Sequence, residues 1–424
     1  MPRICLISPG HLSTNPRLVK EAEALANAGY TVEVISASYT LWGTEEDPAC
    51  TSASWCWVTA LPFGPLAPWH VRLRHAAVTR FAKWAWRVGF RNHYVATAAW
   101  HPLCGDLIKQ ARAIRADLYI AHYPAALPAA ALAARYHQAL YAFDAEDFHL
   151  GDPPEHPRFN ERRALTRAIE SHWLPGCAFL TAASAGIAEA YAATYGVPMP
   201  TVVRNMFPLA QAPPGPTRCG SLRPSPTLYW FSQTIGPDRG LECAVRALAL
   251  AGCSPHLHLR GFISSAYRQQ LEGLARQLGV EQRLHFHAPA PPEQMESLAS
   301  AYDVGLVAET GCTPNRRIAL TNKLFTYALA GIPMILSDIP AHRAVQAEAG
   351  AAARLFRCED AASLADALDA WLLGSPALLA EARAAAYALG QNRWNWESEQ
   401  QDLLKLMTIV LRPREMQDSH SVDT

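Results

Sequence analysis

Short apolar runs alternate with amphipathic stretches along most of the chain. An apolar run at residues 4–8 is followed by Leu18, Ala22 and Leu25, which recur at helical spacing, and the next apolar run covers residues 30–35. Such short runs are typical of strands buried in a parallel sheet, whereas the spacing between them indicates a helix. Strand, helix and strand in this order predict the opening of a doubly wound α/β domain.

The same alternation is repeated in the second half of the chain. Residues 208–226 are rich in proline and glycine and poor in apolar residues, which predicts a linker between two domains. We therefore predict the α/β class, with two Rossmann-like doubly wound domains rather than one closed barrel. The predicted parts are residues 1–207, the linker 208–226, residues 227–390, a last helix at 391–411 and a polar tail at 412–424 that we expect to be disordered.

Residues 321–338 predict a short helix, a stop and a buried strand. Thr321 can cap the helix through its hydroxyl, Gly331 suits the left-handed residue past its end, and Pro333 prevents continuation. A helix that begins after a strand leaves backbone N–H groups unpaired, and Lys323 adds a positive charge there. We predict that a phosphate-bearing ligand binds at residues 321–326; the alternative is an ordinary βα unit with a surface lysine.

A second candidate anion loop follows the predicted strand at residues 227–231. Residues 232–240 are mostly small or polar and include Arg239 and Gly240, and a helix is expected from Leu241. Small residues and an arginine before a helix N-terminus favour an anion. The alternative is that Arg239 is a surface arginine.

Two loops in the first half are also candidates for binding. Gly10 follows the first strand, where a glycine lets backbone approach a ligand, although the Gly-x-Gly-x-x-Gly pattern of dinucleotide oxidoreductases is absent. Asp144, Glu146 and His149 follow the predicted strand at residues 140–143, and ligands bind at the carboxyl ends of strands in open α/β sheets. The alternatives are a plain loop and a polar loop whose groups satisfy one another.

Composition excludes several classes of protein. Lys plus Arg and Asp plus Glu both number 37, and this zero net charge gives no global sign of a nucleic-acid partner. The ten cysteines are scattered, which favours a reduced chain over a disulfide framework or a zinc site. The N-terminus has no signal-peptide pattern, and no apolar run reaches the roughly 20 residues of a membrane span. We expect a cytoplasmic protein, soluble or peripheral at the inner membrane surface.

Residues 69–94 carry six basic residues and no acid. Arg80, Lys83, Arg87 and Arg91 are spaced to share one helical face, beside an apolar face that has Trp84 and Trp86 at its edges. A basic face beside an aromatic one is suited to an anionic membrane surface. The alternative is a solvated helix whose aromatic residues pack in the core.

The segment from Asn322 to Pro333 resembles the donor-binding segment of retaining GT-B glycosyltransferases of the family 4-like group, in which an Asn-Lys-Leu-Phe-Glu-Tyr run precedes an Ala-Gly-x-Pro turn. In that family the glutamate holds the ribose of a nucleotide sugar, and its position is Thr326 here. A second family glutamate falls at Ile318, and Glu309 is the nearest upstream acid that could replace it.

The resemblance extends to the other candidate loops. Two family cations reach the donor diphosphate: Arg239 matches one, the other falls at the uncharged Thr234, and Lys323 could supply its charge. The segment from residue 144 resembles a Tyr-Asp-Ala-His-Glu segment, with Glu146 at the position of a histidine that contacts the donor sugar. His149 follows three residues later.

The resemblance implies two domains facing a cleft, an acceptor domain at residues 1–207 and a donor domain at residues 227–390. It implies a retaining transferase that moves a sugar from a nucleotide sugar to a glycan, lipid-linked or small-molecule acceptor. Glu146 or His149 would orient the donor sugar or help to remove the acceptor proton. The nucleotide sugar is a substrate, and we expect no cofactor, metal or nucleic acid. The alternatives are a GT-B sugar-nucleotide epimerase or hydrolase, and a GT-B-like binding protein without catalysis.

Overall fold

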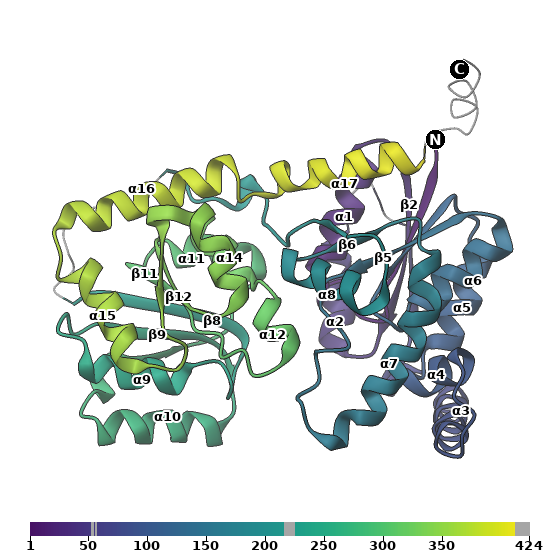
Figure 1. The fold of residues 1–424 in the computed structure, drawn as a ribbon, viewed down its shortest axis with the longest axis horizontal. Helices are drawn as coiled ribbons and strands as arrows, with labels where there is room; N and C mark the ends of the chain where they lie inside the picture. Colours follow the sequence, from purple (N-terminus) through teal and green to yellow (C-terminus); the bar gives the residue numbers. More distant parts are fainter. Residues whose placement is uncertain (52–54, 56, 216–224, 412–424) are drawn as a thin grey trace. The chain divides into compact units, whose positions relative to one another are not determined.

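The computed structural model describes residues 1–51, 55, 57–215 and 225–411. The chain divides into two compact units, one made of residues 1–203 with residues from 400 onward and the other of residues 204–399 (Figure 1). The predicted disorder of the tail at 412–424 and residues 216–224 of the predicted linker lie outside the described residues.

The first unit is built around a seven-stranded parallel sheet in the order β3-β2-β1-β4-β5-β6-β7. Its central strands are buried except for Arg3 at the start of β1, which pairs Ile7 with Ile35 of β2 on one side and with Ala121 of β4 on the other. The strands are β1 (Arg3–Ile7), β2 (Thr31–Ser38), β3 (Trp57–Pro62), β4 (Leu118–His122), β5 (Leu140–Ala145), β6 (Leu180–Ala182) and β7 (Thr201–Val202). The helices are α1 (Pro16–Asn27), α2 (Leu41–Glu46), α3 (Trp69–Arg87), α4 (His93–Trp100), α5 (Cys104–Ala113), α6 (Leu127–His137), α7 (Asn160–Trp173) and α8 (Ala185–Tyr195).

The second unit is built around a six-stranded parallel sheet in the order β10-β9-β8-β11-β12-β13. The strands are β8 (Thr227–Ile235), β9 (His256–Ile263), β10 (Leu284–His287), β11 (Val304–Val307), β12 (Met334–Ser337) and β13 (Ala353–Phe356). The helices are α9 (Leu241–Leu250), α10 (Ser265–Gln277), α11 (Met295–Ala299), α12 (Pro314–Ile318), α13 (Asn322–Leu329), α14 (Pro340–Ala349), α15 (Ala361–Leu372), α16 (Pro376–Asn392) and α17 (Trp396–Val410). The residues of α17 from Gln400 onward belong to the first unit.

Both faces of the second sheet are covered. One core cluster joins Leu257 and Leu259 of β9 to α9, α10 and α15, and another joins Tyr229 of β8 to α11, α13 and α14. Figure 1 shows α9 and α10 on one side of β8 and β9, and α11 and α14 on the other. Helices on both faces of two parallel sheets confirm the predicted α/β class with doubly wound domains.

Two local predictions differ from the structure. Thr321 precedes α13 as predicted, and Gly331 adopts φ 70° past its end, but the Thr321 hydroxyl makes no capping hydrogen bond. The predicted capping by this hydroxyl is therefore wrong. The basic helix ends at Arg87, so Arg91 does not share its face as predicted. Gly89 adopts φ 109° there, a conformation that ends a helix readily.

Candidate functional sites

Each sheet has one point at which the strand order reverses. In the first unit the chain moves outward from β1 through β2 and β3, and then returns to the other side of β1 with β4. In the second unit the corresponding point lies between β8 and β11. Ligands in open α/β sheets bind outside the carboxyl ends of the strands at such a point. The loops after β1, β4, β8 and β11 are therefore the candidate sites, together with the loop after β5, the strand next to β4.

The loop after β8 is held against the end of β11 by a glycine. Gly240 adopts φ 69°, and a Cβ atom built on it would lie 2.3 Å from the carbonyl oxygen of Ala308. Any other residue would be strained and would collide with backbone, so the close approach requires glycine. Asp238 also has a positive φ, 59°. This tight turn fixes Arg239, which lies between Asp238 and Gly240, near the segment that follows β11.

Lys323 and Glu309 form a buried ion pair in this region. Lys323 Nζ lies 3.0 Å from Glu309 Oε1, and both residues are buried. Burial lowers the pKa of Lys323 and of Arg239. Burial alone would raise the pKa of Glu309, but the charges of Lys323 and Arg239 outweigh it and hold that pKa below its usual value. The structure thus brings together Arg239, Glu309 and Lys323, three residues that the sequence singled out.

Arg316 joins this group, although the sequence analysis did not select it. It lies on α12, the helix between β11 and α13, and its Nη1 donates a hydrogen bond of 2.9 Å to the carbonyl oxygen of Asp238. Its charge contributes to the pKa shifts of Arg239, Glu309 and Lys323. The available signal was Pro314 at a helix start beyond a strand, with Arg316 and Arg317 two and three residues later. Three cations around one carboxylate leave an excess of positive charge, which favours a multiply charged anion.

The other predicted residues of this segment lie at or inside α13. The Thr321 hydroxyl oxygen is buried and has no hydrogen-bond partner among the described residues, and Asn322 is half-buried at the first helical position. Thr326 is fully buried and donates a hydrogen bond of 2.8 Å to Glu296 Oε1. A contact between Thr326 and a ribose stays a prediction, because its hydroxyl is already used inside the protein.

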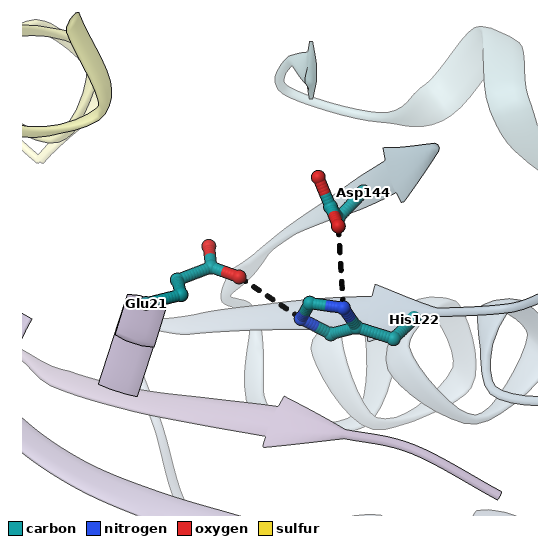
Figure 2. A group of neighbouring side chains, drawn as sticks. All are labelled: Glu21, His122 and Asp144. Atoms are coloured by element: carbon teal, nitrogen blue, oxygen red, sulfur yellow. Dashed lines mark ion pairs between the residues drawn. The ribbon is translucent and has the colours of Figure 1, made fainter. Parts of the chain in front are cut away.

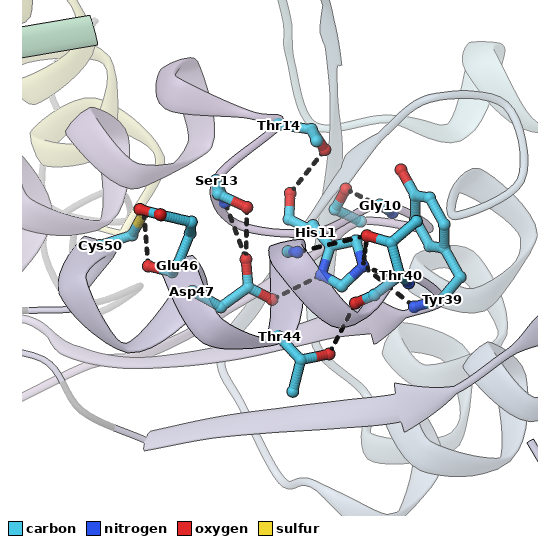
Figure 3. A network of polar contacts seen from close by, with 12 residues as sticks. Gly10, His11, Ser13, Thr14, Tyr39, Thr40, Thr44, Glu46, Asp47 and Cys50 are labelled. Atoms are coloured by element: carbon cyan, nitrogen blue, oxygen red, sulfur yellow. Dashed lines mark hydrogen bonds and ion pairs between the residues drawn. The ribbon is translucent and has the colours of Figure 1, made fainter. Parts of the chain in front are cut away.

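In the first unit, a buried histidine fixes the loop that contains Gly10. His11 Nε2 accepts hydrogen bonds from the backbone N–H groups of Tyr39 and Thr40, so its Nδ1 carries the proton and donates to Asp47 Oδ2 at 2.7 Å (Figure 3). Asp47 also accepts from the backbone and the hydroxyl of Ser13. Gly10 lies at the start of this pinned loop, and its backbone does not adopt a positive φ.

Four buried charged groups meet where α1, β4 and β5 come together. His122 lies between Glu21 of α1 and Asp144 of β5, with nitrogen-to-oxygen distances of 2.9 and 3.3 Å (Figure 2). Arg17 donates one hydrogen bond to each carboxylate oxygen of Asp144, from Nε and from Nη2, both at 2.6 Å. All four residues are buried. Two cations and two carboxylates therefore balance one another in the interior, which is what buried charges require.

The trio of Glu21, His122 and Asp144 has donor atoms close enough to hold a metal ion, but its electrostatics do not fit one. Burial alone would lower the pKa of His122, whereas hydrogen bonds and charges of Asp144 and Glu21 outweigh burial and raise it to about 9. A protonated imidazole has no lone pair to offer a metal. We interpret the trio as part of an internal ion network that fixes the ends of α1, β4 and β5.

Tyr123 brings Glu146 and His149 together at the carboxyl ends of β4 and β5. Its hydroxyl donates to Glu146 Oε2 at 3.3 Å, and its ring lies 5.5 Å from the imidazole of His149. Tyr123 adopts φ 69°, which is costly for an aromatic residue. Strained backbone of this kind clusters at functional sites, and here it aims the tyrosine hydroxyl at the carboxylate.

The two titratable groups of this site are neutral over different ranges of pH. Burial, reinforced by the charge of Asp147, raises the pKa of Glu146 to about 7. Burial lowers the pKa of His149 to about 4, so its imidazole is neutral at pH 7. His149 Nε2 is buried and has no hydrogen-bond partner among the described residues. The site thus offers a carboxyl group that can exchange a proton near neutral pH and a ring nitrogen open to a hydrogen bond.

Known proteins resemble this chain in structure but not in sequence. No protein-family model and no curated protein matches it. HepE of Anabaena, solved with UDP and glucose, is 15% identical, with a TM-score of 0.70 over 96% of this chain and 100% of HepE. Sucrose-phosphate synthase from Thermosynechococcus elongatus is 17% identical, with a TM-score of 0.70 over 97% of this chain and 99% of that protein. A glycosyltransferase from Rickettsia africae is 14% identical, with a TM-score of 0.66 over 97% and 99%.

These matches span nearly the full length of each protein. Together with the two doubly wound sheets, they establish that the chain has the two-domain GT-B fold. The family resemblance that was seen in the sequence is confirmed at the level of the fold. The fold alone does not identify the activity, the donor or the acceptor, because these depend on the residues of the sites.

Proposed function

We propose that this protein is a glycosyltransferase that takes a sugar from a nucleotide-sugar donor. The observation that carries the proposal is the cluster of Arg239, Arg316 and Lys323 around Glu309, at the strand-order reversal of the second sheet. HepE, which shares the fold, has been solved with UDP-glucose. A nucleoside diphosphate is the chemical class that a positive site at this position suits.

The proposed role of the cluster is to stabilise the leaving group. When the bond between the anomeric carbon and the diphosphate breaks, negative charge grows on the departing oxygen. Arg239, Arg316 and Lys323 are fixed before the reaction, by the turn at Gly240, by the bond from Arg316 to Asp238 and by the pair with Glu309. Cations that are already in position lower the barrier without reorganisation. The resemblance implies that the acceptor attacks from the face that the diphosphate leaves, which gives a retaining transfer.

The proposed role of the first unit is to handle the acceptor and its proton. An attacking hydroxyl becomes a better nucleophile as a base accepts its proton, and Glu146 can do so once it is ionised. The neutral His149 can donate or accept a hydrogen bond at Nε2 and so orient a sugar hydroxyl. Tyr123 positions both groups, through its hydroxyl and through its ring.

Helix α3 supports a membrane-bound acceptor or a membrane-proximal site of action. Trp69, Leu73, Phe81 and Trp84 are each more than half exposed, and at 100° per residue they lie within about 120° of the helix circumference. The buried residues His75, Ala82 and Trp86 lie on the opposite side, and the buried Ala85 lies between the two sides. The aromatic residues of α3 are thus divided, because Trp86 packs inside while Phe81 and Trp84 face solvent.

The charges of α3 indicate what kind of surface would contact the exposed apolar stripe formed by Trp69, Leu73, Phe81 and Trp84. The helix contains no acid, and Arg72 and Arg80 are exposed and form no ion pair with any described residue. A stripe of tryptophan and phenylalanine flanked by arginines matches the interface of an anionic bilayer. No helix within the described residues is long and apolar enough to cross a membrane. We propose that α3 lies on the membrane surface.

The experiment that tests the proposal is product analysis with a panel of nucleotide sugars, with and without acceptors. A transferase releases nucleoside diphosphate together with a glycosylated acceptor. Free sugar or an epimerised donor, formed without any acceptor, would identify a hydrolase or an epimerase instead. The Arg239→Ala/Arg316→Ala double variant should abolish product, whereas Arg276→Ala on the exposed side of α10 should not change it.

One observation favours a second candidate, a nucleotide-sugar binding protein without catalysis. The family's ribose-binding glutamate is replaced by Thr326, whose hydroxyl is buried against Glu296. Donor binding without turnover across the whole acceptor panel would support that candidate and contradict the transferase.

A further inference from the structure

A buried polar cluster joins α7 to α8 in the first unit. Tyr191 donates a hydrogen bond of 2.9 Å to Glu170 Oε1, and Tyr195 donates one to Glu170 Oε2. The two tyrosines are four residues apart on α8, so their side chains lie on the same face of that helix. Glu170 and Tyr191 are fully buried. Because burying a carboxyl group is costly and apolar side chains could join the two helices without that cost, the cluster indicates a role besides packing.

Tyr191 also reaches the loop that carries Glu146. Its hydroxyl oxygen lies 3.3 Å from the backbone carbonyl oxygen of Asp147, in addition to its contact of 2.9 Å with Glu170 Oε1. One hydroxyl hydrogen therefore lies between two acceptors, and three-centre hydrogen bonds of this kind are common in folded proteins. Tyr191 thus connects the buried carboxyl group of Glu170 to the backbone directly after Glu146.

The ring of Tyr191 contacts the chain on both sides of Glu146. Its centroid lies 5.5 Å from that of Phe148, edge-on at 86°, and 6.0 Å from that of Phe143 in β5. Tyr191 therefore supports the backbone that leads into Glu146 and the backbone that leaves it. The side chain of Glu146 is held separately, by the hydroxyl of Tyr123.

We propose that Tyr191, whose hydroxyl is fixed by Glu170, is a positioning residue for Glu146. It acts through the carbonyl of Asp147 and the ring of Phe148 rather than through contact with a substrate. A misplacement of about 1 Å in a reacting group can cost about 100-fold in rate, so a side chain that fixes the backbone beside the base contributes to the reaction. The inference rests on the proposed role of Glu146 as the base of the transferase.

The first test compares kcat and KM among variants of the cluster. Tyr191→Phe keeps the ring and removes the hydroxyl, so kcat should fall about 10-fold or more while KM for the donor stays the same. Tyr195→Phe is the matched control, because it removes the other hydroxyl bound to Glu170 and should leave kcat unchanged. Glu170→Gln should restore what Glu170→Leu loses, since an amide can accept a hydrogen bond from one tyrosine and donate one to the other.

The second test does not depend on enzymatic activity. Hydrogen exchange of the backbone amides of residues 146–150, followed by mass spectrometry, should be about fivefold faster in Tyr191→Phe than in the wild type. The same amides should exchange at the wild-type rate in Tyr195→Phe. Circular dichroism of each variant establishes that it is folded.

The inference is overturned if Tyr191→Phe leaves either kcat or the exchange rate at the wild-type value. It is also overturned if Tyr195→Phe changes both quantities as much as Tyr191→Phe does, because the cluster would then only stabilise the fold. If the wild type transfers no sugar, the proposed function fails, and the exchange rates alone decide whether Tyr191 holds the loop that carries Glu146.

Discussion

At the scale of single residues, Glu146 and His149 show how burial separates the properties of two neighbouring groups. Burial disfavours the charged form of each, so the pKa of the acid rises to about 7 while that of the base falls to about 4. At pH 7 the histidine is neutral and the glutamate is close to half-ionised. Only the glutamate changes its charge near neutral pH.

If Glu146 accepts the acceptor proton, activity should follow its ionisation. Below its pKa the carboxyl is protonated and cannot act as a base, so kcat/KM should rise as the pH passes through about 7 and then level off. The Glu146→Gln variant should lose about 100-fold in kcat and lose this rise. The exposed Glu189→Gln on α8 is the control. If Glu146→Gln keeps the wild-type pH profile, Glu146 does not have this role.

Arg316 was not selected from the sequence, and only the structure shows that it belongs to the cation cluster. The family pattern places the second cation at the uncharged Thr234, and the sequence suggested Lys323 as a substitute. Lys323 does lie in the cluster, but it is buried and paired with Glu309, and Arg316 adds a further positive charge. Arg316 comes from α12, which no recognised motif marks, and only the fold brings it to the carbonyl of Asp238. A sequence pattern assigns a charge to a position along the chain, whereas the distance to a second loop depends on tertiary structure.

Replacing Arg316 should weaken binding of a nucleoside diphosphate and leave the fold intact. Loss of one charge-assisted contact costs about 1.5–3 kcal/mol, so we expect the Kd for UDP or GDP, whichever binds, to rise about 10- to 100-fold. Calorimetry measures this change, and the unaltered binding of a plain nucleoside serves as the internal control. Equal losses for nucleoside and diphosphate would place Arg316 away from the phosphates.

His122 should make the stability of the first unit depend on pH. Its pKa is raised above the unfolded value, so its contribution is fully present below about pH 6.5 and is lost as the pH rises through about 9. The His122→Gln variant should be destabilised by about 3–5 kcal/mol at pH 7, because it leaves two buried carboxylates short of a cation. The melting temperature of His122→Gln should lie far below that of the wild type at pH 7, and the difference between the two should be much smaller at about pH 9.5. A difference that stays constant would mean that His122 is neutral in the folded protein.

At the scale of elements, α3 shows what periodicity alone can establish. The sequence correctly placed a helix with a basic and an apolar face, but it could not say which aromatic residues face the core. That depends on the neighbours: α3 packs against α4, and Trp86 is 6% exposed whereas Phe81 is 67% exposed. The helix boundary was also misplaced, because the run of basic residues continues past Gly89.

The exposed stripe predicts binding to anionic vesicles. Wild-type protein should bind phosphatidylglycerol vesicles and not phosphatidylcholine vesicles in a flotation assay, and salt should weaken the binding. Phe81→Ser/Trp84→Ser should reduce it about tenfold or more, since each aromatic ring contributes about 1.5–3 kcal/mol on burial. Tyr136→Ser removes an equally exposed aromatic residue on α6 and should have no effect. Undiminished binding by the double variant would contradict a role for the stripe.

At the scale of the whole molecule, alternating strands and helices predicted the architecture well. Short apolar runs marked most of the parallel strands, because strands covered on both faces must be apolar along their length. The candidate loops also followed, since their place at the ends of strands β1, β5, β8 and β11 depends on chain order. The sequence could not predict which side chains, far apart along the chain, contact one another in the fold. The contacts of Thr326 with Glu296 and of His122 with Glu21 are examples.

The two units carry different parts of the proposed chemistry. The cation cluster belongs entirely to residues 204–399, and the Glu146 site belongs entirely to residues 1–203. Substitutions in the cation cluster and substitutions in the Glu146 site should therefore affect different steps of the reaction. Changes at Arg239 or Arg316 should weaken the binding of donor, whereas changes at Glu146 should leave donor binding intact and slow the transfer.

The central claim is that the cation cluster binds the diphosphate of a nucleotide sugar, and calorimetric titration with UDP-glucose, GDP-mannose and the matching diphosphates tests it most directly. We predict that the wild type and Glu146→Gln bind at least one of these ligands with the same affinity, and that Arg239→Ala/Arg316→Ala does not bind it. Undiminished binding by the double arginine variant, or no binding of any nucleotide sugar by the folded wild type, would contradict the account.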